Sequence, residues 1–248
     1  MAEQKGLTAG NVALVTGASS GIGEAIVELL VERGCKTICA ARRVDRLQTL
    51  RERLGENCHP VELDVTDTAS VDSLLQRLPQ ELRAVDILIN NAGHDIGGRQ
   101  RFDRGDAANM ASVIETNVIG LVRVTHAMIR GMLERGRGDI VNIGSVNGFE
   151  AGPETANYSA SKFAVHGLSR GLRADYKGSG VRIIEILPGL TKTGFAEARW
   201  SGDKARAEEF YGAFPSVMEP MDVARSVLFA LEQPPHVTIA ELVVTMSG

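Results

Sequence analysis

Aromatic residues and cysteines are scarce in this chain. Only 4% of its residues are aromatic, and its three cysteines, Cys35, Cys39 and Cys58, form neither an even set nor a C-x-x-C pair. This spacing excludes a disulfide framework and the common zinc sites, so we expect packed thiols. The five histidines also lack metal-ligand spacing such as H-E-x-x-H, and we predict no metal site.

Long apolar runs and an excess of basic residues are also missing. Charges or glycines interrupt each apolar run well before the length of a membrane span, and the start of the chain, 1–6, does not read as a signal peptide. The formal net charge is −4, whereas nucleic-acid-binding proteins need a basic stripe. We therefore expect a soluble cytoplasmic protein with no nucleic-acid partner and no membrane span.

The chain instead contains short apolar runs that alternate with amphipathic segments. Its 248 residues suffice for one α/β domain or two small ones, and no linker divides them. Strands are predicted over 12–15, 36–41, 59–63, 85–89, 139–143, 181–187 and 236–246. Helices are predicted over 22–33, 44–54, 71–78, 108–135 and 220–231, with a further helix opening near residue 158.

The stretch Thr16–Gly23, T-G-A-S-S-G-I-G, joins the first strand to the first helix. Its glycines permit a sharp turn and the close approach of a phosphate, and the free amides of the first helical turn favour an anion. The spacing differs from the usual G-x-G-x-x-G fingerprint, so a ligand-free turn is the alternative. The candidate nucleotide-binding residues here are Gly17, Ser19, Ser20, Gly21, Ile22 and Gly23.

The end of the second strand bears on the choice of cofactor. A site for NAD usually places Asp or Glu there, but this chain has Ala41 followed by Arg42 and Arg43. Two guanidiniums can bind a 2′-phosphate, and no carboxylate repels it. We predict a preference for NADP, the alternative being a solvated basic start to the next helix.

Tyr158 and Lys162 are four residues apart and therefore lie on one face of a helix. A phenol is a poor acid or base at neutral pH unless a nearby cation favours its ionised form, and Lys162 would supply that cation. Ser145 precedes Tyr158 by 13 residues and follows a strand. Taken alone, the Tyr and Lys are more typical of an ordinary surface pair.

Together, T-G-A-S-S-G-I-G, N-N-A-G over Asn90–Gly93, Y-S-A-S-K over Tyr158–Lys162 and P-G-L-T-K-T over Pro188–Thr193 resemble the motifs of the classical short-chain dehydrogenase/reductase family. The resemblance covers essentially the whole chain. It implies a single Rossmann-type α/β domain over 1–248, doubly wound around a parallel seven-stranded sheet. It also implies an NADP(H)-dependent enzyme that transfers hydride between the cofactor and a small alcohol or carbonyl substrate.

The resemblance assigns roles to individual residues. Tyr158 would exchange a proton with the carbonyl oxygen, Ser145 would hydrogen-bond that oxygen, and Lys162 would hold the nicotinamide ribose. Asn117 would kink its helix and hold a water, and Asn90 would be structural. The further cofactor-binding residues implied are Asp64, Val65, Asn91, Ala92, Gly93, Pro188, Gly189, Leu190, Thr191 and Thr193. Asp64 could instead be a helix cap, and we expect Asp67 to be one.

The segment 192–216 is more polar and is predicted to be a substrate lid. Arg199 or Lys192, next to Phe195 and Trp200, could pair with an anionic substrate, or Arg199 could simply face solvent next to Glu197. Asn147 is a further candidate substrate residue. His94 and Asp95 follow the N-N-A-G motif, and we expect His94 to be a partly exposed loop residue rather than a pocket residue.

The double arginine, the P-G-L turn with Phe195 and Arg199 beyond it, and the P-H-V-T-I ending look most similar to bacterial NADP-dependent 3-hydroxy acid (serine-type) dehydrogenases. This favours a small 3-hydroxy acid or alcohol as substrate, with sulfoacetaldehyde or a neutral carbonyl as alternatives. A non-catalytic NADP-binding regulatory protein, or an epimerase or dehydratase on the same fold, is also possible. The family resemblance further implies a homotetramer, or a dimer, that pairs the helices carrying Asn117 and Tyr158 and, across another axis, the last helix and strand.

Overall fold

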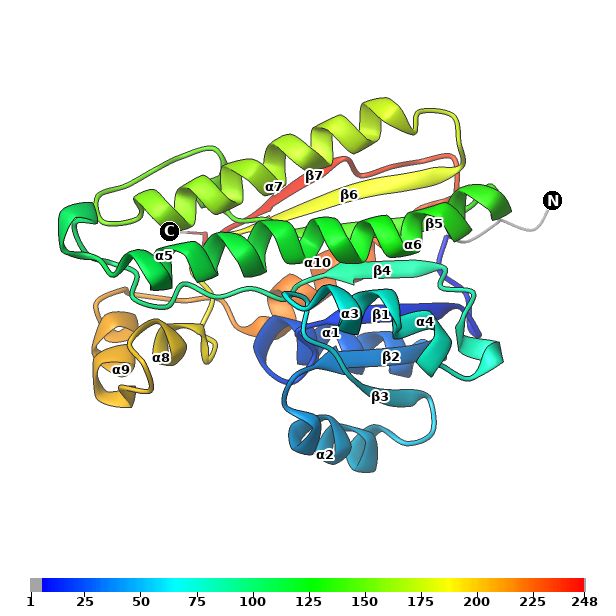
Figure 1. Cartoon of the computed structure of the whole chain (residues 1–248), viewed down its shortest axis with the longest axis horizontal. Helices are drawn as coiled ribbons and strands as arrows, with labels where there is room; N and C mark the ends of the chain where they lie inside the picture. Colours follow the sequence, from blue (N-terminus) through cyan, green and yellow to red (C-terminus); the bar gives the residue numbers. More distant parts are fainter. Residues whose placement is uncertain (1–5, 248) are drawn as a thin grey trace.

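The computed structural model describes residues 6–247, so most of the segment on which the signal-peptide expectation rests lies outside the described residues. Seven parallel strands form one sheet with helices on both faces, as predicted (Figure 1). The strands are β1 (Val12–Thr16), β2 (Lys36–Ala41), β3 (Cys58–Glu62), β4 (Ile87–Asn90), β5 (Gly138–Ile143), β6 (Val181–Pro188) and β7 (Glu241–Val244).

The order of the strands in the sheet is β3-β2-β1-β4-β5-β6-β7. The chain winds outward in one direction from β1 to β3 and then in the other direction from β4 to β7. The strand order therefore reverses between β1 and β4, which pair through Ala13–Val15 and Ile87–Ile89. In open parallel sheets, ligands bind at the carboxyl ends of the strands beside this point.

The helices that flank the sheet alternate with the strands along the chain. They are α1 (Gly21–Glu32), α2 (Val44–Leu54), α3 (Thr68–Asp72), α4 (Leu74–Arg77), α5 (Ala107–Ile114), α6 (Leu121–Arg135), α7 (Ala156–Asp175), α8 (Phe195–Arg199), α9 (Lys204–Gly212) and α10 (Pro220–Leu231). Short turns of other helix types are η1 (Gln80–Leu82), η2 (Phe102–Arg104), η3 (Glu115–Gly120) and η4 (Val146–Gly148).

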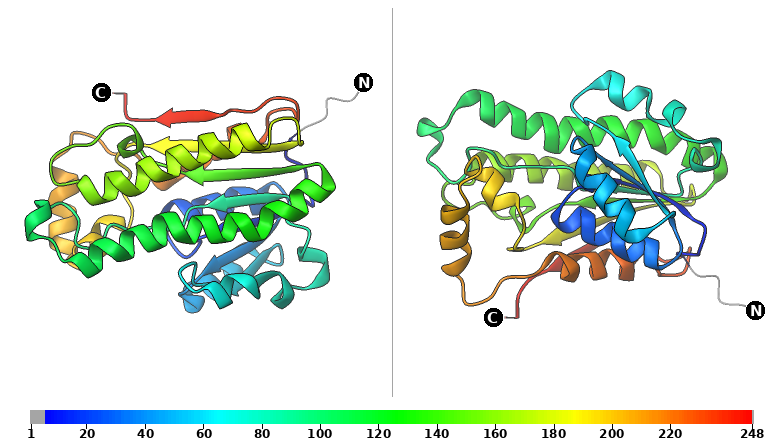
Figure 2. Two further views of the ribbon diagram at one scale, coloured as in Figure 1. Left: turned by 45° about the horizontal axis from the view of Figure 1, so that its top comes forward. Right: turned by 90° about the horizontal axis from the view of Figure 1, so that it is seen from below.

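Each face of the sheet is covered by its own apolar core. One core joins α1, α2 and α10 to the sheet, and the other joins α3, α4 and α6. Figure 2 shows α5 continuing into α6 along one axis with α7 beside them over the second face, and α8 and α9 set apart at one end. The strands are rich in Val, Ile and Leu because a parallel sheet is buried on both faces.

Three predicted elements differ from those observed. The helix predicted over 108–135 is interrupted by η3, which is a π-helix, and the helix predicted over 71–78 is broken at Ser73. The strand predicted over 236–246 is limited to Glu241–Val244, which is the part that pairs with β6. Alternating apolar residues extend beyond the ladder, but only backbone pairing makes a strand.

Several local predictions are confirmed. The Asp67 side chain caps α3 by accepting a hydrogen bond of 3.0 Å from the Ala69 amide. The three cysteines are buried free thiols. Within 6–247, no helix is both long and apolar enough to cross a membrane.

Candidate active site

The glycine-rich turn after β1 packs directly against the N-N-A-G segment after β4. Gly17 has a φ of +66°, and a Cβ atom on it would lie 2.9 Å from the Ala92 Cα. A Cβ on Gly23 would lie 2.5 Å from the Asn91 Nδ2 atom. Glycine is therefore required at both positions, because any side chain would push the two segments apart.

Hydrogen bonds hold these two segments in register. The Thr16 hydroxyl accepts from the backbone amides of Asn91 and Ala92, each at 3.0 Å, and the Asn91 side chain donates to the Thr16 carbonyl at 2.9 Å. Asn90 is buried and donates to the Asn142 side chain at 2.9 Å, which bridges β4 and β5. The structural role expected of Asn90 is thus confirmed.

A cavity of about 700 Å³ opens at the carboxyl ends of the strands, beside the point where the strand order reverses. Every predicted cofactor-binding residue except Gly23 lines it. Gly23 instead packs against the Gly17 carbonyl and the Asn91 side chain. The cavity is also lined by Ser145, Asn147, Phe195 and Arg199. An elongated nucleotide fits such a place, because the glycine turn leaves room at the start of α1 for phosphate.

The two arginines after β2 have different surroundings. Arg43 donates from Nη2 to the hydroxyls of Ser19 at 2.8 Å and Ser20 at 2.7 Å, so it ties the glycine turn to the end of β2. Arg42 is exposed and forms no hydrogen bond or ion pair with other residues of 6–247. Asp64 accepts from the Thr66 amide at 2.9 Å while still lining the cavity.

Ser145, Tyr158 and Lys162 meet at the inner end of the cavity. Ser145 follows β5, and the other two lie one turn apart on α7. The Lys162 Nζ donates to the Ile143 carbonyl at 2.8 Å and lies 5.7 Å from the centroid of the Tyr158 ring. Burial lowers the pKa of Lys162 to about 8, while the negative charge of Glu185 acts in the opposite direction.

The pKa of Tyr158 is raised above that of a free phenol, and the expected effect of Lys162 on its ionised form stays a prediction. Burial and then the Asp95 carboxylate raise the pKa of Tyr158, whereas the Ser145 hydroxyl and Arg199 lower it. Desolvation of the phenolate is the largest of these effects, so Tyr158 stays a protonated phenol.

Asn117 lies in η3 and is almost fully buried. Its Oδ1 accepts from the His94 amide at 2.9 Å, and its Nδ2 donates to the His94 carbonyl at 3.0 Å and to the Ser161 hydroxyl at 3.1 Å. This side chain links the loop after β4 to α7, and π-turns inside helices are common at functional sites. The expected break in helical geometry at Asn117 is confirmed, and its role in holding a water stays a prediction.

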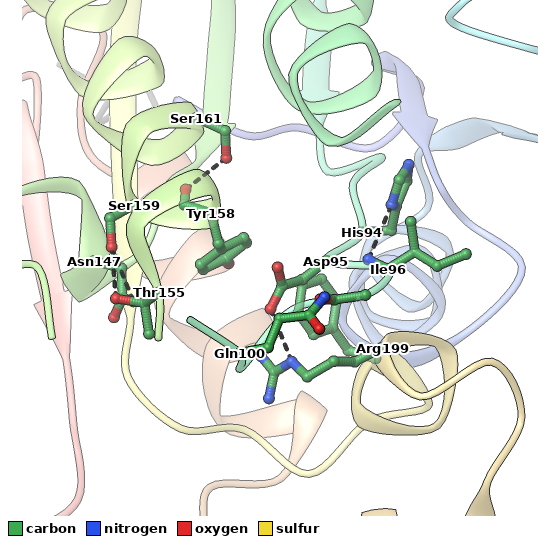
Figure 3. Close-up of polar contacts among 12 residues, drawn as sticks. His94, Asp95, Ile96, Gln100, Asn147, Thr155, Tyr158, Ser159, Ser161 and Arg199 are labelled. Atoms are coloured by element: carbon green, nitrogen blue, oxygen red, sulfur yellow. Dashed lines mark hydrogen bonds and ion pairs between the residues drawn. The ribbon is translucent and has the colours of Figure 1, made fainter. Parts of the chain in front are cut away.

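The lid is fastened to the loop that follows β4. Arg199 donates from Nε to the Asp95 carboxylate at 2.8 Å, and its carbonyl accepts from the Gly97 amide at 3.0 Å. Figure 3 shows Asp95 and Arg199 pointing toward each other on the side of the cavity where Tyr158 lies. The Phe195 ring meets Tyr158 edge-on, with centroids 5.6 Å apart. The alternative that Arg199 faces solvent is therefore wrong.

Asn147 stands on the opposite wall of the cavity. Its side chain donates to the Ser159 hydroxyl at 3.4 Å, and its backbone amide donates to the Ser145 hydroxyl at 3.1 Å. These contacts fix the start of η4 and the orientation of Ser145, so Asn147 reaches the substrate region chiefly through its neighbours. His94 is partly exposed as expected, but it also lines the cavity, so the expectation that it is not a pocket residue is wrong. Its Nε2 lies 3.0 Å from the Thr116 hydroxyl.

Two charged residues of the cavity had no role assigned from the sequence: Asp95, named only as following the N-N-A-G motif, and Arg99, which no motif marks. Both line the cavity, and the Arg99 guanidinium lies 4.9 Å from the centroid of the Phe210 ring in the lid. Asp95 is 4% exposed, which is unusual for an ionisable loop residue. The only sequence signal was position, because both residues lie just after the N-N-A-G motif at a carboxyl end of the sheet.

Comparisons with known proteins agree with this site. The short chain dehydrogenase family matches residues 11–204, which include the glycine turn, Ser145, Tyr158 and Lys162. The chain belongs to the short-chain dehydrogenase family. It is therefore an oxidoreductase, and its Rossmann-type α/β sheet is the fold of this family.

Individual members of the family match nearly the whole of this chain. The NADP-dependent 3-hydroxy acid dehydrogenase YdfG of Salmonella typhi is 38% identical over 229 residues, covering 92% of each chain. A closed form of serine dehydrogenase complexed with NADP+ has a TM-score of 0.91 at 37% identity, covering 95% of this chain and 97% of that one. Serine dehydrogenase from Escherichia coli has a TM-score of 0.82 at 35% identity, covering 94% and 96%.

Proposed function

We propose that this protein is an NADP(H)-dependent oxidoreductase that interconverts a small 3-hydroxy acid or related alcohol and its carbonyl product. One observation carries the proposal. Ser145, Tyr158 and Lys162 converge at the inner end of the same cavity whose outer end is formed by the glycine turn and Arg42. The names of the similar 3-hydroxy acid and serine dehydrogenases support it.

The nicotinamide cofactor, when bound, supplies or accepts the hydride. Its pyrophosphate would lie against the turn of Gly17, Ser19 and Gly21 and the start of α1, where a Cβ atom would intrude. Pro188–Thr193, Asn91, Ala92 and Gly93 would flank its nicotinamide half, and Asp64 and Val65 its adenine.

The chain's own residues would handle the proton and the oxygen. In carbonyl reduction, the Tyr158 hydroxyl donates its proton to the substrate oxygen, and burial keeps that phenol protonated beforehand. The Ser145 hydroxyl donates a hydrogen bond to the same oxygen. The Lys162 ammonium stabilises the tyrosinate that forms, and Asn117 fixes the loop and helix around it.

The preference for NADP would rest on Arg42. Its guanidinium forms no hydrogen bond or ion pair with the other described residues, and it lies at the outer wall of the cavity, where the adenosine ribose would come to rest. The neighbouring Arg43 is already bonded to Ser19 and Ser20. A bidentate contact with a 2′-phosphate suits the free guanidinium.

The substrate end of the cavity offers a cation to an anionic group. Arg99 and Arg199 contribute two positive charges to this wall, and Asp95 and Glu197 contribute two negative charges. The Arg199 Nε is used by Asp95, which leaves its terminal nitrogens to pair with a small carboxylate.

A substrate screen tests the proposal. Wild-type protein with NADP+ would be assayed against serine, 3-hydroxypropionate, 3-hydroxybutyrate and neutral alcohols of equal size, and with NADPH against the matching carbonyls. We expect turnover that favours the acids and is lost in Tyr158→Phe. A Tyr158→Phe enzyme with wild-type NADPH-dependent turnover would contradict the acid role of Tyr158. Cofactor binding without turnover on any substrate would instead favour a regulatory protein.

A further inference from the structure

Glu185 on β6 is a buried acid that the proposed function does not use. Its side chain is completely buried, and its Oε2 atom lies 2.9 Å from the His166 Nδ1 on α7. Its Oε1 atom is also buried and has no hydrogen-bond partner among residues 6–247. A buried carboxylate with an unsatisfied oxygen destabilises the folded protein unless a nearby cation compensates.

The unpaired oxygen faces the residue next to the Lys162 anchor. A Cβ atom on Gly144 would lie 2.6 Å from the Glu185 Oε1 atom, so the carboxylate occupies the space that a side chain would fill. Gly144 directly follows Ile143, whose carbonyl accepts the hydrogen bond from Lys162 Nζ. The missing side chain therefore leaves room for a buried carboxylate beside the residue that follows the Lys162 anchor, and its negative charge acts on Lys162.

His166 holds this arrangement from α7. It lies four residues after Lys162, so the two side chains share one face of the helix. A Cβ on Gly148 would lie 3.1 Å from the Lys162 carbonyl oxygen and 3.6 Å from the His166 Cβ. Gly148 thus lets η4 pack closely onto this face. The His166 bond then fixes which way the Glu185 carboxylate points.

We propose that Glu185, oriented by His166, is a positioning residue that acts as the buried counter-ion of Lys162 and keeps its ammonium charged at the Ile143 carbonyl. The proposal rests on the proposed function only in that Lys162 serves catalysis there. Burial alone would favour a neutral amine at this depth. Glu185 supplies the opposing charge without touching substrate or cofactor, because it lies outside the cavity lining.

Other charges face Glu185 from neighbouring elements. Burial raises the pKa of Glu185, whereas His166 and Arg173 on α7 lower it and Glu241 on β7 raises it. His166, Glu185 and Glu241 bring ligand-type atoms within 4.8 Å of one another. Arg173, however, donates to the Glu241 carboxylate, so its guanidinium already supplies the positive charge that a metal ion would otherwise bring to this group.

The charge on Lys162 can be measured without substrate or cofactor. Trace acetylation with acetic anhydride modifies only neutral amines, and mass spectrometry of the Lys162 peptide across a pH series gives the midpoint of its titration. We expect a midpoint near 8 in wild type. In Glu185→Gln we expect it to fall by about one pH unit or more, the effect of removing a close opposite charge.

Matched variants separate a charge effect from a packing effect. Glu241→Gln removes a neighbouring but partly exposed carboxylate and should leave the midpoint unchanged. Glu185→Asp keeps the charge and should leave the midpoint closer to wild type than Glu185→Gln does. An unchanged midpoint in Glu185→Gln, or an equal fall in Glu185→Asp, would overturn the proposal.

A second route covers the case in which Glu185→Gln does not fold. Gly144→Ala adds a methyl group that must displace the Glu185 carboxylate, so the Lys162 midpoint should fall although no charge is removed. A folded Gly144→Ala protein with a wild-type Lys162 midpoint would refute the role of Glu185 as the counter-ion of Lys162. Because the labelling needs no turnover, its result is independent of whether the proposed reaction is correct.

Discussion

Arg199 in the lid and Asp95 in the loop after β4 form a buried ion pair, with Nε and Oδ2 2.8 Å apart. The two residues are 104 positions apart in the chain, and both are largely shielded from water. Their contact fastens the lid to this loop and contributes to the charges around the Tyr158 hydroxyl, because Asp95 raises the pKa of Tyr158 and Arg199 lowers it. The ion pair therefore joins the lid to the surroundings of the acid.

Loss of this pair should open the lid rather than unfold the protein. In Asp95→Asn the Arg199 cation remains buried without its partner, and breaking a buried pair this way costs about 3–5 kcal/mol. We expect the backbone amides of 195–212 to exchange with solvent about 100-fold faster, measured by hydrogen exchange and mass spectrometry. Asp103→Asn, whose partner Arg101 is exposed, is the control. Unchanged protection in Asp95→Asn would show that other contacts hold the lid.

Arg199 should discriminate between acidic and neutral substrates. In Arg199→Ala we expect the ratio of kcat/KM for 3-hydroxy acids to that for neutral alcohols to fall about 10- to 100-fold, as expected for one charge-assisted contact. Taking the ratio removes the effect of a loosened lid, which both substrates share. Arg206→Ala changes another guanidinium over the same Trp200 ring and should leave the ratio intact. Equal losses on both substrates would exclude an anion contact.

Arg42 should determine the choice between NADP and NAD. Because each charge-assisted hydrogen bond to a phosphate contributes about 1.5–3 kcal/mol, Arg42→Ala should weaken NADP binding about 10- to 100-fold and NAD binding far less. Fluorescence titration with each cofactor measures both dissociation constants. Arg53→Ala is the matched control, because Arg53 pairs with Glu24 and Glu28. If both cofactors weaken equally, Arg42 does not contact the 2′-phosphate.

The pH dependence of activity should follow Lys162 rather than Tyr158. The pKa of Lys162 is lowered to about 8, so its ammonium is present below that pH and is lost as the pH rises through it. Tyr158 has a raised pKa and keeps its proton over the same range. We expect kcat/KM for NADPH, which reports groups of the free enzyme, to decline as the pH rises through about 8.

Lys162→Arg tests this assignment. A guanidinium does not titrate below about pH 12, so the alkaline decline should disappear from this variant even if its overall activity is lower. Ser145→Ala should lower activity but retain the decline, because it leaves Lys162 in place and its loss only raises the pKa of Tyr158 further. A decline that persists in Lys162→Arg would assign it to another group.

The sequence was sufficient to predict the fold and most of the cavity lining. Buried parallel strands appear as continuous apolar runs, and the glycine turn and the N-N-A-G motif follow those runs, so their meeting at one sheet edge could be predicted. The interruption at Glu115–Gly120 could be anticipated only through the family resemblance, because a π-turn leaves no periodic signal of its own.

The charged contacts could not be predicted in this way. Asp95 and Arg199 come together only when the lid folds back over the sheet, and no local pattern specifies that pairing. Glu185 lies within an apolar strand, and its pairing with His166 depends on how α7 crosses β6. The raised pKa of Tyr158 could not be predicted either, because the sequence shows the nearby cation but not the depth of burial.

The remaining prediction concerns assembly. Ile119, Val122 and Phe163 expose apolar side chains on η3, α6 and α7, and Phe229 and Val243 do so on α10 and β7. Exposed apolar residues on two separate faces are typical of two symmetric interfaces, which is the arrangement of a homotetramer.

Light scattering at micromolar concentration should give four copies for wild type. Val122→Glu and Phe229→Glu should each leave dimers and their combination monomers, because a buried unpaired charge disrupts an apolar interface. A monomeric wild type would refute the tetramer, and a tetramer that survives either substitution would show that the corresponding face lies outside the interface.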